Sequence, residues 1–237
     1  MTDGFALEVE GVSSGYGEAL IVRDASLTIG RGEILSLLGK NGMGKSTLLK
    51  TIMGFLPLRG GGVVRLFGDT VSGLPPYKVA RRSIAYVPQE QALFQDLTVD
   101  ENLRLGLRDH GAFEAGLARA TQAFAFLAQR RQQRAGTLSG GEQKMLLVAR
   151  ALMAAPRLML IDEISEGLQP SVIERLAAVL RAQRDEHGTS ILLVEQNVRF
   201  ALSVADSYAL IKSGEIVDRG SVGTPGAETD IAAHLSV

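Results

Sequence analysis

The chain has 237 residues, enough for one large domain or for one domain with an inserted subdomain. Its 46% hydrophobic and 22% charged residues are typical of a well-packed globular protein, and 25 Lys and Arg against 26 Asp and Glu give no general attraction to nucleic acid. The absence of cysteine excludes disulfides and thiol catalysis, and no apolar run reaches the roughly 18 residues of a membrane span. We therefore expect contact with a membrane only through a partner protein.

The first predicted elements are strands. Residues 5–9 and 25–29 alternate apolar and polar side chains, which is the pattern of half-buried strands. Three further runs are short and continuously apolar, as in strands buried on both faces of a mostly parallel sheet. These runs are residues 34–38, 158–161 and 191–194.

Helical spacing of apolar residues appears between the buried strands. Residues 48–52 show it after the first run, and residues 172–180 show it after the second. Ser171 and Glu174 are expected to form a capping box at the start of the latter helix. Buried strands that alternate with helices predict an α/β fold.

The middle of the chain has a different composition. Residues 90–155 are rich in Ala, Gln, Leu and Arg and contain no convincing strand, so a helical insert is predicted there. Near the end, residues 210–217 indicate a hairpin that turns at a Ser-Gly pair. The tail from residue 220 to 237 shows no informative pattern.

Residues 39–46 match the phosphate-loop pattern G-x-x-x-x-G-K-[ST] at every fixed position, after a predicted strand and before a predicted helix. The glycines let backbone N–H groups turn toward phosphates, and the helix N-terminus adds the positive end of its dipole. Lys45 is expected to reach the β- and γ-phosphates, and the Ser46 hydroxyl to bind Mg²⁺. The residues expected to contact the nucleotide are Asn41, Gly42, Gly44, Lys45, Ser46 and Thr47. The alternative is a glycine-rich turn that binds no ligand.

A pair of acids, Asp162 and Glu163, ends the second buried run. Carboxylates at the C-terminal end of such a strand lie where α/β sheets bind ligands. Asp162 is expected to hold Mg²⁺, mainly through water, and Glu163 to accept a proton from the water that attacks the γ-phosphate or to orient that water. Alone, an Asp-Glu pair after a strand is often only a helix cap. The phosphate loop in the same chain favours the catalytic interpretation.

Residues 138–143, Leu-Ser-Gly-Gly-Glu-Gln, predict a second anion site. Ser139 and Glu142 form another capping box, so a helix begins here with two glycines in its first turn. Its bare N–H donors, hydroxyl and dipole suit an anion, yet the phosphate loop already holds this chain's nucleotide. The economical explanation is a nucleotide held by another subunit. The residues expected to contact it are Ser139, Gly140, Gly141 and Gln143.

Together with Gln89, these motifs resemble those of the ATP-binding-cassette (ABC) ATPases, and the resemblance covers nearly the whole chain. It implies ATP and Mg²⁺ as ligands and two ATPase domains that pair head to tail. It also implies a P-loop NTPase fold whose mixed central sheet carries an N-terminal antiparallel β part and a helical signature subdomain. Residues 1–237 would be a single ABC ATPase domain, with a RecA-like core and β subdomain in 1–89 and 156–237 and a helical insert in 90–155.

The resemblance assigns three further residues. Tyr16 matches the aromatic residue that stacks on adenine, and Gln89 matches the glutamine that contacts Mg²⁺ and the attacking water at the entry to the helical insert. Gln196 stands at the switch position, where the family commonly has His; its amide can donate a hydrogen bond to the γ-phosphate but cannot carry a positive charge. Ile164 and Gln169 also depart from the family's common Pro and Asp, in the loop through which the resemblance implies communication between subunits.

Residues 165–170 and 194–197 resemble the smaller ATPase subunit of branched-chain amino-acid importers, a pattern that urea and short-amide importers share. This implies a transmembrane permease, a like or unlike second ATPase subunit, an indirect solute-binding protein, and the cytoplasmic face of the inner membrane. Two alternatives are an ABC switch acting on DNA or ribosomes and a regulatory cassette that does not turn ATP over. No nucleic acid is expected, because basic residues 129–134 lack interleaved aromatics and fit a solvated helix end.

Overall fold

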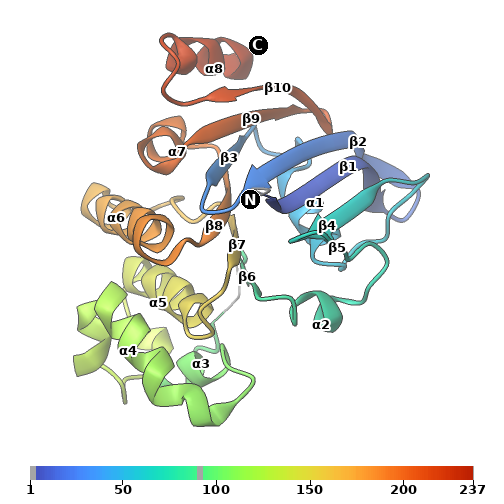
Figure 1. Cartoon of the computed structure of the whole chain (residues 1–237). Helices are drawn as coiled ribbons and strands as arrows, with labels where there is room; N and C mark the ends of the chain where they lie inside the picture. Colours follow the sequence, from blue (N-terminus) through green and yellow to red (C-terminus); the bar gives the residue numbers. More distant parts are fainter. Residues whose placement is uncertain (1–3, 90–92, 237) are drawn as a thin grey trace.

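A computed structural model describes residues 4–89 and 93–236 of the chain (Figure 1). The predicted buried strands lie at the centre of a six-stranded sheet in the order β10-β9-β3-β8-β7-β6. All neighbours in this sheet are parallel except β10 and β9, which form the predicted hairpin. Its strands are β3 (Ile34–Leu38), β6 (Ile84–Val87), β7 (Leu158–Asp162), β8 (Ser190–Glu195), β9 (Ser207–Lys212) and β10 (Glu215–Ser221).

The N-terminal part of the chain forms a second, antiparallel sheet, as the family resemblance implied. Its order is β2-β1-β4-β5, and both alternating segments of the sequence lie in long strands of it. The strands are β1 (Phe5–Tyr16), β2 (Ala19–Gly30), β4 (Val63–Leu66) and β5 (Asp69–Thr70).

The apolar core has two main parts because successive side chains of a strand point to opposite faces of the sheet. Leu158 and Leu160 of β7 pack with helix α1 (Lys45–Ile52) and with the antiparallel sheet. Met159 and Ile161 of the same strand pack on the other face, with the helices that cover it. Burial on both faces explains why the central strands have continuously apolar sequences.

The described residues between β6 and β7 contain helices and no strand (Figure 1). The elements are α3 (Val99–Arg104), η1 (His110–Ala112), α4 (Phe113–Ala123), η2 (Ala125–Gln129), η3 (Ala135–Thr137) and α5 (Gly140–Leu152). Capping boxes start α3 at Thr98 and α5, as predicted, at Ser139. The division of the chain into a core and an insert at residues 90 and 155 stays a prediction.

The basic segment 129–134 is more than a solvated helix end. The 3-10 helix η2 ends at Gln129, and the Arg131 guanidinium then makes a bidentate contact with Asp100, with Nη2 2.7 Å from Oδ2 and Nε 2.9 Å from Oδ1. Because the Asp100 side chain is only 9% exposed, this arginine compensates a largely buried carboxylate.

Among the remaining helices, one begins at a different residue from the predicted one, and another was not predicted. The helices are α2 (Pro76–Val79), α6 (Pro170–His187), α7 (Val198–Val204) and α8 (Ala227–Ser236). The capping box predicted from Ser171 and Glu174 is wrong, because α6 begins at Pro170 with Gln169 as N-cap and no side-chain cap. Proline has a fixed φ and no N–H, which suits the first helical position, and the helix begins two residues earlier than one capped by Ser171 would. The tail, which showed no pattern, contains α8.

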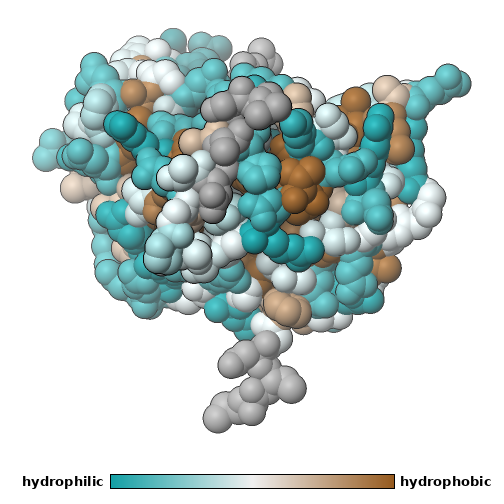
Figure 2. Space-filling model, turned by 90° about the horizontal axis from the view of Figure 1, so that it is seen from above, coloured by the Kyte–Doolittle hydropathy of each residue, from teal (hydrophilic) through white to brown (hydrophobic). Residues whose placement is uncertain are grey.

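The surface over β10 and α8 is mostly hydrophilic, with apolar side chains in small separate groups (Figure 2). Large apolar side chains among the described residues are most exposed at Tyr77 (60%), Phe94 (58%) and Phe55 (54%). No helix in the described ranges is both long and apolar enough to cross a membrane.

Candidate active site

One set of the predicted site residues meets at the edge where the parallel strands β3, β7 and β8 end. The loop after β3 reaches α1 through Gly42 and Gly44, whose φ angles of 79° and 102° favour glycine. Gly44 is the N-cap of α1, so the first N–H groups of the helix face the end of the sheet. A β-carbon on Gly39 would lie 2.7 Å from the carbonyl oxygen of Ile211, which explains the glycine at the start of the loop.

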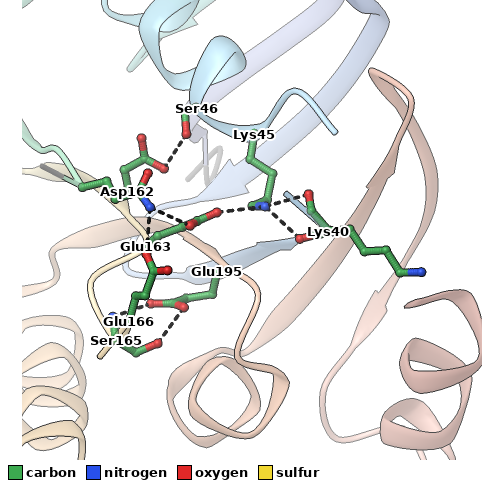
Figure 3. A network of polar contacts seen from close by, with 10 residues as sticks. Lys40, Lys45, Ser46, Asp162, Glu163, Ser165, Glu166 and Glu195 are labelled. Atoms are coloured by element: carbon green, nitrogen blue, oxygen red, sulfur yellow. Dashed lines mark hydrogen bonds and ion pairs between the residues drawn. The ribbon is translucent and has the colours of Figure 1, made fainter. Parts of the chain in front are cut away.

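Lys45 is the centre of a buried polar network (Figure 3). Its Nζ donates hydrogen bonds to the carbonyl oxygens of Gly39 at 2.8 Å and Lys40 at 3.0 Å. It also lies 2.9 Å from Oε1 of Glu163, with the two side chains 3% and 5% exposed. The motif lysine and the predicted base are therefore in direct contact, from the first helix and from the end of β7.

Asp162 lies beside the ion pair and faces the start of α1. It accepts hydrogen bonds from the Ser46 hydroxyl at 3.0 Å and the Tyr86 hydroxyl at 3.4 Å. Burial raises the pKa of Asp162, the neighbouring Glu163 charge adds to this, and the two hydroxyl contacts oppose it. A hydroxyl and a buried carboxylate are the hard oxygen donors that Mg²⁺ prefers when phosphates supply further ligands. The residues present fit a magnesium ion between Ser46 and Asp162.

The backbone of Glu163 is held in an uncommon conformation. Its φ is 43°, and its N–H donates to the carbonyl oxygen of Val194 at 2.9 Å. Gln89 Nε2 donates to carboxylate oxygens of Glu163 at 3.0 Å and Glu166 at 2.9 Å. The carbonyl oxygen of Gln89 accepts a hydrogen bond from Lys144 of α5 at 2.6 Å. Gln89 thus connects the predicted base to the helix that carries the second anion motif.

A hollow of about 400 Å³ opens beside this network, the size of a ligand site. Tyr16, at the end of β1, lines it and is 46% exposed, and Nζ of Lys50 lies 5.8 Å from the centroid of its ring. An exposed aromatic ring can stack on a flat ligand. The hollow's lining residues are Tyr16, Ile21, Asn41, Gly42, Gly44, Lys45, Ser46, Thr47, Gln89 and Glu163.

The residues of the second anion motif lie elsewhere, at the first turn of α5. None of Ser139, Gly140, Gly141 and Gln143 lines the hollow. The Ser139 hydroxyl is engaged with Glu142, and Gln143 Nε2 donates to the carbonyl oxygen of Leu138 at 3.0 Å. Gln196, just beyond β8, is exposed. The structure therefore brings together one set of predicted residues and leaves the other set facing outward.

Among the residues of the network, the sequence interpretation gave no site role to Tyr86, Lys144, Glu166 and Glu195. Tyr86, Lys144 and Glu166 act through partners that are far away in sequence, and no local pattern signals them. Glu195 could have been identified from the sequence, because it is an acidic residue at the end of a buried strand, as Asp162 is.

Residues 22–166 match the protein family described as ABC transporter. The chain belongs to this family. It is 41% identical to BraG of Pseudomonas aeruginosa, a high-affinity branched-chain amino acid transport ATP-binding protein, over 89% of this chain and 91% of the relative. It is 37% identical to a probable branched-chain amino acid transport ATP-binding protein, LivF of Archaeoglobus fulgidus, over 89% of each chain. LptB of Escherichia coli, from a lipopolysaccharide export system, is 33% identical over 91% of this chain and 90% of the relative.

Solved structures of ABC cassettes share the fold. An ATP-binding subunit of an ABC transporter, 28% identical, superposes with a TM-score of 0.83 over 98% of this chain and all of the other. A dimeric ATP-binding cassette with ADP and Pi, 23% identical, has a TM-score of 0.80 over 92% of this chain and 99% of the other. As a member of this family the chain binds nucleotide and is an ATPase.

Proposed function

We propose that this ABC ATPase powers the import of branched-chain amino acids from the cytoplasmic face of the membrane, attached through a permease. The observation that carries the cargo assignment is the 41% identity to BraG across nearly the full length of both chains. The match to a lipopolysaccharide export protein at 33% shows that the fold alone does not determine the cargo. A solute-binding protein would deliver the amino acid to the permease.

The geometry supports specific roles in hydrolysis. The hollow beside Tyr16 accepts ATP. The γ-phosphate of the ATP then replaces the Glu163 carboxylate as the partner of Lys45 Nζ. Glu163 is then available to accept the proton of the attacking water, which Gln89 orients. Mg²⁺, held by Ser46 and through water by Asp162 and Gln89, would neutralise phosphate charge. Gln196 donates a neutral hydrogen bond to the γ-phosphate.

The outward-facing motif on α5 supports a paired arrangement. Ser139 to Gln143 do not line the hollow that contains the phosphate loop, which supports a role for them at a nucleotide held by another chain. In a head-to-tail dimer each ATP would lie between the phosphate loop of one subunit and the α5 N-terminus of the other. Hydrolysis would then depend on pairing with an identical or related subunit.

A second hollow, of about 710 Å³, supports the attachment to a permease. It lies between β6 and the helices of the middle segment, with Phe94 (58% exposed) and Leu105 (52% exposed) in its lining. Arg150 also lines it; burial lowers the pKa of this guanidinium, and no partner for it is found in the described part of the chain. We assign this hollow to a cytoplasmic permease segment that carries apolar residues and a carboxylate.

The test is purification of the tagged chain from its native membranes, followed by assay of the co-purified complex. The proposal predicts a permease partner and ATPase activity stimulated by leucine, isoleucine or valine with its binding protein, and not by urea. Leu105→Asp should abolish permease capture without affecting the ATPase activity of the isolated chain, whereas Val217→Asp, at another exposed site, should change neither. Co-purification with ribosomes, DNA or a lipopolysaccharide exporter would refute the cargo assignment.

A further inference from the structure

One buried carboxylate beside the site has none of the roles assigned above. Glu195 is the last residue of β8, is 1% exposed, and directly precedes Gln196. Its Oε1 accepts a hydrogen bond from the backbone N–H of Ser165 at 3.0 Å, and its Oε2 accepts one from the Ser165 hydroxyl at 2.8 Å. Figure 3 shows this contact next to the pair formed by Lys45 and Glu163.

Ser165 lies in the turn that follows Glu163. The turn is fixed to β8 at two points: the carbonyl oxygen of Val194 holds the N–H of Glu163, and the carboxylate of Glu195 holds Ser165. Ser165 is itself only 5% exposed. Gln196 directly follows Glu195 in the chain. Any displacement of Ser165 therefore acts, through Glu195, on the backbone that positions the Gln196 side-chain amide.

Stability does not explain a carboxylate at this position. Taking a carboxylate out of water is costly unless its hydrogen bonds compensate fully, and an apolar residue at the end of a buried strand would avoid that cost. Burial raises the pKa of Glu195 to about 7, the Ser165 and Asn197 hydrogen bonds oppose this, and the Glu163 charge adds to it. Both protonation states can keep the contact, because a serine hydroxyl either donates or accepts.

We propose that Glu195 is a positioning residue: by holding Ser165 it fixes the Glu163 carboxylate and the Gln196 amide relative to each other during hydrolysis. The inference rests on the roles proposed above for Glu163 and Gln196. It predicts that breaking the contact between Glu195 and Ser165 slows turnover without weakening the binding of Mg-ATP at the phosphate loop.

The experiment measures steady-state ATPase kinetics and Mg-ATP binding for the full-length chain and its variants. Glu195→Ala should lower kcat about tenfold, the scale of one lost hydrogen bond to a charged group, and Ser165→Ala should lower it less. The double variant should be no slower than Glu195→Ala alone, because both substitutions act on the same contact, between Glu195 and Ser165. Glu195→Gln should recover most of the activity, because its amide can accept from the Ser165 N–H and donate to the hydroxyl. The Kd for Mg-ATP should stay within about twofold in all of them.

Ser36→Ala is the matched control. It removes a buried hydroxyl from the neighbouring strand β3 that has no hydrogen-bond partner within the described ranges, so kcat should not change. Thermal melting identifies a variant that fails to fold. If Glu195→Ala does not fold, the kcat values of Ser165→Ala and Glu195→Gln test the proposal. Wild-type kcat in Ser165→Ala, or a Glu195→Gln variant as slow as Glu195→Ala, would overturn the proposal. Undiminished turnover in Glu163→Gln would instead refute the proposed base.

Discussion

The buried carboxylate of Glu195 should make the stability of the protein fall as pH rises. Its pKa is raised from 4.5 to about 7 in the folded chain, mainly by burial. Between these values the folded state keeps a proton that the unfolded state has lost, so the unfolding free energy decreases with pH. The full difference corresponds to about 3 kcal/mol, of which about 2.5 kcal/mol falls between pH 5 and pH 8.

The assay is urea unfolding of the wild type and of Glu195→Gln at pH 5 and pH 8. Glutamine has no proton to lose, so the variant should gain about 2.5 kcal/mol relative to the wild type as the pH rises from 5 to 8. Other carboxylates, including Asp162 with its raised pKa, contribute to both proteins and cancel in the comparison. Glu174→Gln, on the exposed face of α6, is the control and should follow the wild type. Parallel pH dependence of Glu195→Gln and the wild type would refute the reasoning.

Three further predictions concern the network and the core. Ser36→Ala should raise the unfolding free energy by about 1 kcal/mol in urea titrations, because it removes a buried hydroxyl without a partner in the described part of the chain; a loss of stability would contradict this. Asp100→Ala should lower it by about 2 kcal/mol, because Arg131 loses its bidentate partner, whereas Asp96→Ala, at an exposed carboxylate without a hydrogen bond or ion pair in the described part of the chain, should change it little. Glu163→Gln should abolish ATP turnover and lower the melting temperature without nucleotide, because Lys45 loses its buried counter-ion, and Mg-ATP should restore most of that loss. A melting temperature equal to the wild type's would show that the ion pair between Lys45 and Glu163 does not stabilise the nucleotide-free fold.

The sequence predicted the parts of the fold that depend on local patterns. The central strands are continuously apolar because both of their faces are covered, and the loop that ends at Lys45 follows from its glycine spacing. Capping was predicted correctly at Ser139 and wrongly at Ser171, because the preceding Pro170 starts its helix earlier. Helix α8 was missed, since its composition shows no clear apolar periodicity.

The candidate site was predictable residue by residue but not as a network. The pairing of Lys45 with Glu163, and of Gln89 with Glu163 and Glu166, joins residues more than 70 positions apart, and only the topology of the sheet brings them together. The same holds for Ser165, in the turn after β7, and Glu195, at the end of the neighbouring strand β8, which are 30 residues apart. Sequence patterns identify the chemical groups, whereas strand order decides which of them touch.

The central claim is that each ATP site is built from two chains, and a mixing experiment tests it most directly. Lys45→Ala removes the phosphate-loop lysine, whereas Gly140→Asp places a carboxylate at the start of α5, where a β-carbon would have no atom of the described residues beyond its own helix backbone within 4 Å. Each variant alone should be inactive. A one-to-one mixture should recover about a quarter of the wild-type ATPase activity, because half of the dimers would be mixed and each would hold one intact site of two. A mixture that stays inactive, while the wild type hydrolyses ATP under the same conditions, would contradict the account.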